Sequence, residues 1–554
     1  MSTRRAVVDA LDRIAFSAEL LDDPRARTWT AAAWAVRNSS GDLRELLDSG
    51  ELAKVRGIGK STLKAVTQAL DGQKPDALVD LEARVPEGLF GIRKVKGLGP
   101  KKVKRLWQEL AVTSLGELEY ACRENRLVDL SGFGTKTQDS VLAEIDRLRS
   151  TAGALRRDQA RAILEPIEHA LWVADAVAQV AVVGDWARGE ELVRELAVLV
   201  ETSDPDAARE QLERARPRDV EVALHVADAA SFAAVRVWLT SSAGHAAALA
   251  ARAEARGWRF DPEGLFDADG AAIGCEEEDD VYRALGLVPT ALERRQDGVP
   301  LVLEGRARPA LVRREDLRGA LHNHTVASDG NATLEEMREA AAARGLEYLG
   351  ISEHSPSAFY ARGLEKERLF EQLTTIDALN VEPGGCTLLT GIESDIREQG
   401  ELDYPDEVLA ELDVVVASVH KRHPQDAAAM TRRMVAAASH PFTDVVGHPT
   451  GRLLLGRAPS EYDVEAFLDA CRDHGVAVEL NANPHRLDLN EHHLKLAKER
   501  GVLVSIAADA HAVRELDHLD YGVTIARRAG LTAEDVLNAR TLEELRRWIA
   551  ERRA

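Results

Sequence analysis

The chain contains little cysteine and no paired cysteine motif. Its 554 residues include four cysteines, Cys122, Cys275, Cys386 and Cys471, and no two of them form a CxxC pair. This scatter argues against a disulfide framework and against a cysteine-ligated zinc site. It is typical of a protein that works in a reducing cytosol.

Long apolar runs are also missing. No stretch of about 18 apolar residues occurs, so we expect no membrane span. The N-terminal segment MSTRRAVVDALDR is charged and amphipathic, without the apolar core of a signal peptide. We therefore expect a cytoplasmic protein.

Positive charge is scarce overall but unevenly distributed. The net charge is −22, which by itself disfavours a nucleic-acid partner. Residues 1–150 carry 25 Lys and Arg against 22 Asp and Glu, or +3, so the remainder carries −25. A chain of this length is expected to form several domains. Any polyanion should therefore meet the N-terminal third first.

Three short segments of this N-terminal third share one pattern. Each has an apolar residue, a second residue, Gly, an apolar residue, Gly, and then a residue that can open a helix. Two glycines one residue apart permit a tight turn with positive φ, and they leave backbone N–H groups exposed at a helix N-terminus. The segments are residues 55–60 (VRGIGK), 95–100 (VKGLGP) and 130–135 (LSGFGT).

Cations flank the first two segments, whereas the third has one nearby cation, Lys136. This combination resembles the helix-hairpin-helix motif, which holds the DNA backbone without reading bases. The alternative is a set of ordinary helix ends, because Gly terminates many helices. Three copies favour the phosphate-binding interpretation. The flanking cations are Lys54, Arg56, Lys60, Lys96, Lys101, Lys102, Lys104 and Arg105. The predicted DNA-binding residues are Gly57, Gly59, Lys60, Gly97, Gly99, Lys101, Lys102, Gly132 and Gly134.

The middle of the chain changes to short strands at residues 180–184, 196–200 and 220–226, followed by a helix that begins near residue 242. With the hairpins, this segment resembles the palm and thumb of bacterial-type family-X DNA polymerases. In that family, a Gly-Ser pair opens the nucleotide-binding loop and three strand carboxylates hold two magnesium ions.

This chain departs from that pattern at almost every point. Asp185 follows Gly184 in place of serine, and the alternating carboxylate pair falls on Glu195 and Ala197. The third carboxylate position falls on Ala223, unless a slip by one step brings in Glu221. One carboxylate cannot hold two magnesium ions against a nucleotide triphosphate. We therefore expect a degenerate palm that does not polymerise.

The C-terminal part alternates short apolar strands with helices of roughly 10–15 residues, a pattern that predicts parallel strands in a β/α barrel. Helical periodicity covers residues 333–344 and 460–474. The predicted strands are residues 346–351, 386–389, 414–418, 444–447, 476–480 and 502–506.

Histidines and acids stand at or just after the ends of these strands. Ligands at the carboxyl ends of barrel strands converge on one face. Imidazoles and carboxylates hold divalent zinc, manganese or iron, and nine of them exceed the needs of one ion. We therefore predict a cluster of two or three metals. The candidate ligands are His322, His324, Asp329, His354, Glu393, His420, His448, Asp509 and His511.

The motifs around these residues resemble the polymerase and histidinol phosphatase (PHP) domain, in which nine such positions bind three metals. Segment 478–489 also resembles the bacterial polymerase-X subgroup. Ala320 replaces the aspartate that usually precedes the HxH motif, and Glu353 replaces the aspartate of the usual Asp-His pair. Neither change removes a ligand, but both bear on the groups that orient ligands.

Together, the resemblances imply three domains. These are an α-helical, fingers-like helix-hairpin-helix region at residues 1–150, an α+β palm and thumb at 151–309, and a distorted β/α barrel at 310–554. A single histidine near a strand end is more often structural than ligating. We assign structural or surface roles to His423, His440, His474, His485, His492, His493 and His518.

The resemblance implies a manganese-dependent 3′–5′ exonuclease or 3′-end-processing enzyme of DNA repair, with zinc or iron as alternative metals. Its partner would be DNA bound without sequence preference at 3′ ends or gaps, which places the protein at the nucleoid. Candidates for substrate phosphate contact are Lys421, Arg452 and Arg486, although a solvated surface charge is the better interpretation of Lys421. The predicted catalytic residues are His322, His324, Glu393, Asp509 and His511.

Three other functions remain open at this point. A small-molecule phosphatase would use the same metals but not the hairpins. A DNA-end-binding scaffold would bind DNA without turnover. Gap-filling synthesis would require a working palm.

Overall fold

The computed structural model describes residues 3–39, 42–55, 57–128, 130, 132–149, 153–218, 220–421 and 425–554. Arg56, Ser131 and His423, on which sequence predictions fall, lie outside these ranges. The chain forms two compact units, residues 1–147 and 148–554. None of the described helices is both long and apolar enough to cross a membrane.

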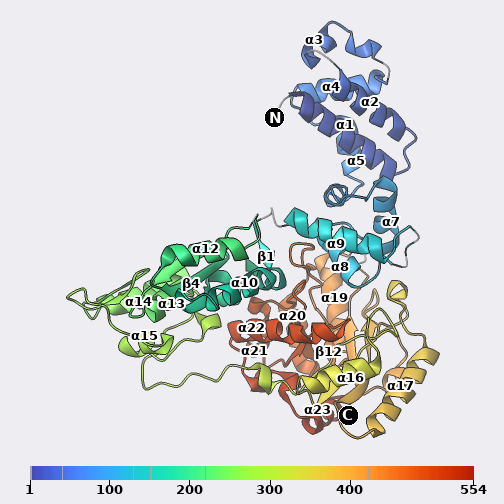
Figure 1. Ribbon diagram of the computed structural model, residues 1–554. Coiled ribbons are helices and arrows are strands. Elements are labelled where there is room, and N and C mark those ends of the chain that lie inside the picture. The colour runs from blue at the N-terminus through green and yellow to red at the C-terminus, as the bar shows by residue number, and fades with distance from the viewer. Residues whose placement is uncertain are drawn as a thin grey trace. The chain divides into compact units, whose positions relative to one another are not determined.

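Helices joined by turns and loops make up the described residues of the first unit, without a β-strand among them (Figure 1). Its core forms where apolar faces of α1 and α2 pack together, with Trp29 and Val36 of α2 buried against Leu11 and Ile14 of α1. The helices are α1 Thr3–Leu20, α2 Ala26–Asn38, α3 Leu43–Asp48, η1 Leu52–Lys54, α4 Lys60–Leu70, α5 Asp76–Glu82, α6 Leu89–Ile92, α7 Pro100–Leu110, α8 Leu115–Arg123 and α9 Thr135–Arg149.

The second unit opens with the predicted palm. A three-stranded sheet has the order β2-β4-β5, with β2 antiparallel and β5 parallel to the central strand β4. The three predicted strands are therefore confirmed, and β5 is shorter than expected. The palm elements are β1 Leu155–Arg156, α10 Arg157–Trp172, β2 Val177–Val183, α11 Gly184–Ala187, β3 Leu192–Val193, β4 Ala197–Thr202, α12 Pro205–Ala215 and β5 Ala223–Ala227.

A small helical lobe follows the palm sheet, with its own apolar core around Val237, Leu249 and Tyr282. Its second helix starts where expected, because the Ser242 side chain accepts a hydrogen bond from the backbone N–H of His245 and caps the helix. The elements of this lobe are α13 Phe232–Leu239, α14 Ala243–Glu254, β6 Arg259–Asp261, β7 Gly264–Phe266, α15 Glu278–Ala284 and η2 Leu292–Arg294.

The remainder is a nearly closed barrel of seven parallel strands in chain order, β8 to β14. A bridge between Asn323 and Ala510 joins its two ends, and the Asn538 side chain donates hydrogen bonds to the carbonyls of Gly319 and Ile506. The strands are β8 Gly319–Ala320, β9 Tyr348–Ile351, β10 Thr387–Asp395, β11 Val414–Ser418, β12 Val445–Val446, β13 Ala477–Asn481 and β14 Val504–Ala507.

Helices separate successive barrel strands, as the sequence pattern predicts (Figure 1). The helix predicted at 333–344 is α16, which Thr333 and Glu336 begin with reciprocal cap hydrogen bonds. The two-residue strand β8 was not predicted, because it is too short to show a pattern. The helical elements are η3 Arg314–Asp316, α16 Leu334–Ala343, η4 Phe359–Ala361, α17 Lys366–Val381, α18 Asp406–Leu409, α19 Ala427–Ala438, α20 Val464–His474, α21 Glu491–Glu499, η5 Val513–His518, α22 Leu519–Ala529, η6 Ala533–Asp535, η7 Leu537–Ala539 and α23 Leu542–Arg553.

Candidate metal centre and DNA-binding hairpins

All nine predicted ligands meet at the carboxyl ends of the barrel strands. His322 and His324 follow β8, His354 follows β9, and Glu393 lies near the end of β10. Eight of the nine residues are buried, and His420 is half-buried. Side chains from positions up to 189 residues apart, from His322 to His511, therefore form one cluster.

Glu393 lies at the middle of this cluster. Its Oε1 is 3.3 Å from His322 Nε2, 3.2 Å from His420 Nε2 and 3.0 Å from His448 Nε2. Its Oε2 is 2.8 Å from His354 Nδ1 and 3.9 Å from His324 Nε2. One carboxylate therefore faces two sets of imidazoles, an arrangement suited to bridging two ions.

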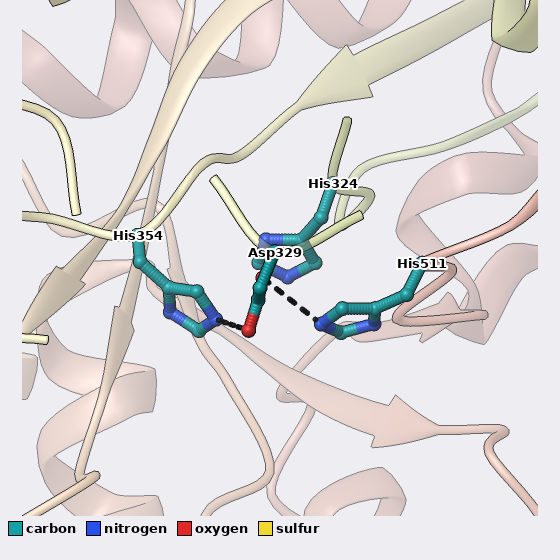
Figure 2. Close-up of side chains that lie close together, drawn as sticks. All are labelled: His324, Asp329, His354 and His511. Carbon is teal, nitrogen blue, oxygen red and sulfur yellow. Dashed lines mark ion pairs between the residues drawn. The ribbon is translucent and has the colours of Figure 1, made fainter. Parts of the chain in front are cut away.

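Asp329 connects a second group. Its carboxylate lies between His354 Nε2, at 3.4 Å, and His511 Nε2, at 3.3 Å (Figure 2). In this view the His324 ring lies behind the Asp329 side chain. Ligand atoms of His324, Asp329, His354 and His511 all lie within 4.8 Å of one another. This spacing suits a single divalent ion.

Two further groups meet the same distance limit of 4.8 Å, and they share residues with the first. One comprises His322, His324 and Asp509, and the other comprises His354, Glu393 and His420. Because His324 and His354 each belong to two groups, neighbouring ions would share ligands. These clusters could therefore bind more than one metal ion.

Several buried polar atoms of the cluster make no hydrogen bond, which supports a cation at this place. Both ring nitrogens of the fully buried His324 lack a hydrogen-bond partner, as do His322 Nε2 and Glu393 Oε2. A buried polar atom left without a partner costs about 1–3 kcal/mol. A divalent ion would satisfy these atoms together, so the residues fit a metal centre.

Burial and neighbouring charged groups shift the pKa values of these histidines and of Glu393. Burial lowers the pKa of His322 and His354, but nearby carboxylates outweigh burial and raise both well above the ordinary value. Burial and the Arg486 charge lower the pKa of His448 to about 3. Burial raises the pKa of Glu393, but His420 and other histidines outweigh it and hold that pKa well below its usual range. Metal ions would replace the protons that now balance the carboxylates.

Glu479 is a site residue that the sequence reasoning missed. It is fully buried in β13, and its Oε2 lies 2.6 Å from His322 Nδ1. Its Oε1 accepts hydrogen bonds from the His448 backbone N–H at 3.1 Å and from Asn481 Nδ2 at 2.8 Å. A neutral His322 that donates its Nδ1–H to Glu479 would present the lone pair of Nε2 to the cluster. A glutamate inside an otherwise apolar strand was the available signal.

Ala320 and Glu353, the two residues that depart from the family motifs, lie in different surroundings. Ala320 is buried in β8 and packs in the barrel core. Glu353 is buried but does not belong to the three metal-holding groups found among the described residues. Its carboxylate accepts hydrogen bonds from the Thr325 and Ser328 hydroxyls, and from Gln372 Nε2 at 3.0 Å. Glu353 therefore organises the loop that carries Asp329.

The three candidate phosphate contacts lie in different surroundings. Arg486 is 3% exposed, and its Nε lies 3.6 Å from Asp509 Oδ2. Arg452 instead pairs with Glu191 of the palm. Lys421 is exposed. Among the three, Arg486 is the cation beside the predicted ligands.

The three glycine segments adopt the same hairpin geometry. Gly57, Gly97 and Gly132 have φ of +99°, +89° and +85°. In each hairpin the residue after this glycine donates a backbone hydrogen bond to the residue three positions earlier, at 2.9–3.1 Å. Nothing lies within 4 Å of the position that a Cβ would occupy at Gly97 or Gly99. A phosphate backbone could therefore approach closely.

The flanking cations divide into two groups. Lys54 pairs with Glu51, Lys104 with Asp22, and Arg105 with Glu109. Within the described ranges, the exposed Lys60, Lys96 and Lys101 take part in no ion pair. Lys102 Nζ lies 5.3 Å from the centre of the Phe133 ring, which belongs to the third hairpin. The exposed, unpaired lysines are the stronger candidates for phosphate contact.

The palm positions that carry carboxylates in family-X polymerases are apolar here. Ala197 pairs directly with Ala223 in the β4–β5 register. Ala197 is 3% exposed and packs in a cluster with Leu199, Phe232 and Val235. The exposed carboxylates near this place, Glu195 and Glu221, line a cavity of about 620 Å³.

Three family models match parts of the chain. The SAM-like helix-hairpin-helix tandem covers residues 91–147, the DNA polymerase beta thumb covers 235–296, and the PHP domain covers 320–483. These matches confirm the hairpin, thumb and PHP architecture that the motifs predict. The thumb match corresponds to the small lobe that contains α14 and α15.

Named relatives match the whole chain or the barrel. The DNA polymerase/3′-5′ exonuclease PolX of Bacillus subtilis is 32% identical over 568 residues, which cover 99% of each chain. A probable phosphatase of Caldanaerobacter subterraneus is 29% identical over 245 residues, which cover 42% of this chain and 91% of that protein. A probable phosphatase of Edwardsiella ictaluri is 30% identical over 240 residues, with coverage of 41% and 93%.

Proposed function

Since this chain belongs to the PolX family of DNA polymerases with a C-terminal PHP domain, we propose that it is a metal-dependent 3′–5′ exonuclease or 3′-end-processing enzyme. In this proposal, DNA synthesis has been lost. The domains would be residues 1–150 for DNA binding, 151–309 for the degenerate palm and thumb, and 310–554 for phosphoesterase chemistry.

The observation that carries the proposal is the overlap of three ligand groups, which share His324 and His354. Divalent ions held there, manganese foremost and zinc or iron as alternatives, would activate water and neutralise charge on a phosphate ester. The proposed ligands are His322, His324, Asp329, His354, Glu393, His420, His448, Asp509 and His511.

The protein's own groups would orient the substrate and the ligands. The Arg486 guanidinium, buried beside Asp509, would bind a non-bridging phosphate oxygen. Glu479 would keep His322 in the tautomer that points Nε2 at the centre. Burial of the cluster excludes bulk water, which strengthens these electrostatic contacts.

The apolar palm positions support the loss of polymerisation. Ala197 and Ala223 are paired neighbours with no ligand atoms, and Asp185 is held by Arg188 Nη2 at 2.5 Å and the Arg194 backbone N–H at 3.0 Å. An exposed Glu195 alone would bind magnesium too weakly to place a nucleotide. Primer extension on gapped DNA with magnesium or manganese should show no nucleotide incorporation.

The hairpins support DNA as the substrate. Three turns with exposed glycines and lysines suit sequence-independent contact with phosphates at 3′ ends or gaps. Replacing Lys101 with Ala should weaken DNA binding by roughly threefold to tenfold and lower the salt dependence by about one ion. Lys366→Ala, in the barrel domain, is the matched control.

The central test is digestion of a primer labelled at its 5′ end. With manganese, the purified protein should shorten the primer from its 3′ end, and His322→Ala should abolish this activity. His474→Ala, on the exposed end of α20, should behave as the wild type. Metal analysis of the same preparations identifies the ion, and excess chelator should stop hydrolysis. No shortening with any divalent ion would refute the proposal.

A small-molecule phosphatase is the second candidate, because the relatives that match only the barrel are named as probable phosphatases. Hydrolysis of phosphomonoesters at a higher kcat/KM than DNA, unaffected by Lys101→Ala, would favour it. A third outcome, DNA binding without turnover, would indicate a scaffold.

A further inference from the structure

A loop of the palm is anchored to the phosphoesterase barrel close to the metal centre. This loop runs from the end of α11 to β3 and carries Glu191. The Glu191 carboxylate makes two parallel contacts with Arg452, 3.0 Å to Nη1 and 2.8 Å to Nη2. Arg452 lies on the loop that follows His448. This paired geometry is the strongest form of an Arg–carboxylate contact.

Arg452 in turn holds the chain segment that carries Arg486. Its Nε donates to the Arg486 carbonyl at 3.0 Å, and its Nη2 donates to the Leu487 carbonyl. The Arg486 side chain extends to Asp509, with Nε 3.6 Å from Oδ2. A continuous set of polar contacts therefore joins Glu191 of the palm to a predicted metal ligand.

The loop has a second anchor that fixes its position. Arg528 of α22 donates to the Arg188 carbonyl at 2.6 Å and pairs with Glu190 at 3.2 Å. Gly189 has a φ of +76°, and a Cβ there would lie 2.5 Å from Thr524 Cγ2. The close approach of the loop to α22 therefore requires glycine.

We propose that Glu191 is a positioning residue for the phosphoesterase site and acts through Arg452 on Arg486. This inference rests on the proposed function, because it assigns Arg486 to the substrate phosphate. The palm, which has alanines at the two strand positions 197 and 223, would thus support catalysis in the barrel.

Two physical effects follow from the Glu191 contact. The carboxylate offsets the positive charge of Arg452. It also fixes the Arg452 guanidinium plane, which keeps the carbonyls of Arg486 and Leu487 in place. Without Glu191, the two carbonyl contacts would hold Arg452 less firmly, so that its guanidinium could turn toward solvent or toward the carboxylates of the centre. Either movement would displace Arg486.

The test compares Glu191→Gln, Arg452→Met and the double variant in the full chain loaded with manganese. The control is Glu210→Gln, an exposed glutamate that pairs with Arg214 on its own helix. The measurements are bound metal, melting temperature, affinity for inorganic phosphate by calorimetry, and kcat and KM for DNA cleavage.

We expect Glu191→Gln to weaken phosphate binding and lower kcat by roughly tenfold, with bound metal and melting temperature close to the wild type. Arg452→Met should have a similar effect, and the double variant should be no worse than Arg452→Met. Phosphate affinity and kcat within about twofold of the wild type, or losses that follow metal content or melting temperature, would overturn the inference.

The phosphate measurement separates the inference from the proposed function. If the wild type cleaves no DNA, the proposed function fails, but weaker phosphate binding in Glu191→Gln still supports the positioning role. If the wild type does not bind phosphate either, Arg486 has no phosphate to hold and the inference fails.

Discussion

The barrel and the palm sheet carry opposite kinds of side chain at their buried strand ends, a carboxylate in the first and alanine in the second. In the barrel, Glu393 is 1% exposed and lies within 4 Å of five imidazoles. In the palm, Ala197 is 3% exposed and packs only with apolar side chains in its cluster. A buried carboxylate persists where cations and ligands offset its desolvation, and an apolar residue needs no such partner. The environment of each strand end therefore shows where ionisable groups cluster in this chain and where apolar side chains have taken their place.

The largest expected effect comes from removing the central carboxylate of the barrel. Glu393→Gln keeps the side-chain shape but removes the charge that the surrounding histidines face. We expect DNA hydrolysis to fall by roughly a thousandfold or more, together with the bound metal. Primer digestion and metal analysis check this result, with Glu339→Gln on the exposed face of α16 as the control. If Glu393→Gln hydrolysed DNA at nearly the wild-type rate, the barrel cluster would not be the site of hydrolysis, and the proposed functional difference between barrel and palm would be wrong.

The reverse change in the palm should act on stability instead. Ala197→Asp places a carboxylate in an apolar cluster without a partner, so we expect the free energy of unfolding to fall by about 3–5 kcal/mol. Urea denaturation at pH 7 measures the change, and Ala178→Asp, at an exposed position of β2, is the control. If the Ala197→Asp variant were as stable as the wild type and incorporated nucleotides, the palm would still be able to bind magnesium.

Glu479→Gln tests the contacts that orient a proposed metal ligand in the barrel. One amide oxygen cannot accept both from His322 Nδ1 and from the His448 backbone N–H, which now use different oxygens of the carboxylate. We expect metal affinity to weaken by roughly 10-fold to 100-fold. Titration with manganese measures it. An unchanged affinity would mean that Glu479 does not orient His322.

The smallest effect is expected from the palm carboxylate that remains. Glu195 is exposed, and it takes part in no ion pair with another residue that the structure describes. Glu195→Ala should therefore leave DNA cleavage and phosphate binding within about twofold of the wild type. A larger loss of cleavage would give the palm cavity a role in substrate handling that our proposal does not include.

The strands of the barrel and the nine clustered residues could be predicted because their signals are local. Short runs of Val, Leu and Ile show buried parallel strands, and the polar residues that follow them mark the strand ends. β8 was missed because two residues, Gly319 and Ala320, carry no pattern. Glu479 was missed because the sequence alone does not show that His322, 157 residues earlier, is its neighbour.

Arg452 is a second residue whose partner the sequence does not reveal. The sequence made it a candidate for contact with substrate phosphate, but the structure pairs it with Glu191, 261 residues away. Its role depends on a contact between two lobes, and no local pattern reports such a contact.

Donor chemistry and strand periodicity are properties of short segments, so the amino-acid sequence was enough to predict which residues could bind metal and phosphate. Tertiary structure alone decided which donors face one another, since closing the barrel places distant strand ends on one rim. It also decided that Ala197 is core and that Glu191 holds Arg452, because burial and ion pairing depend on atoms that meet only after the chain has folded.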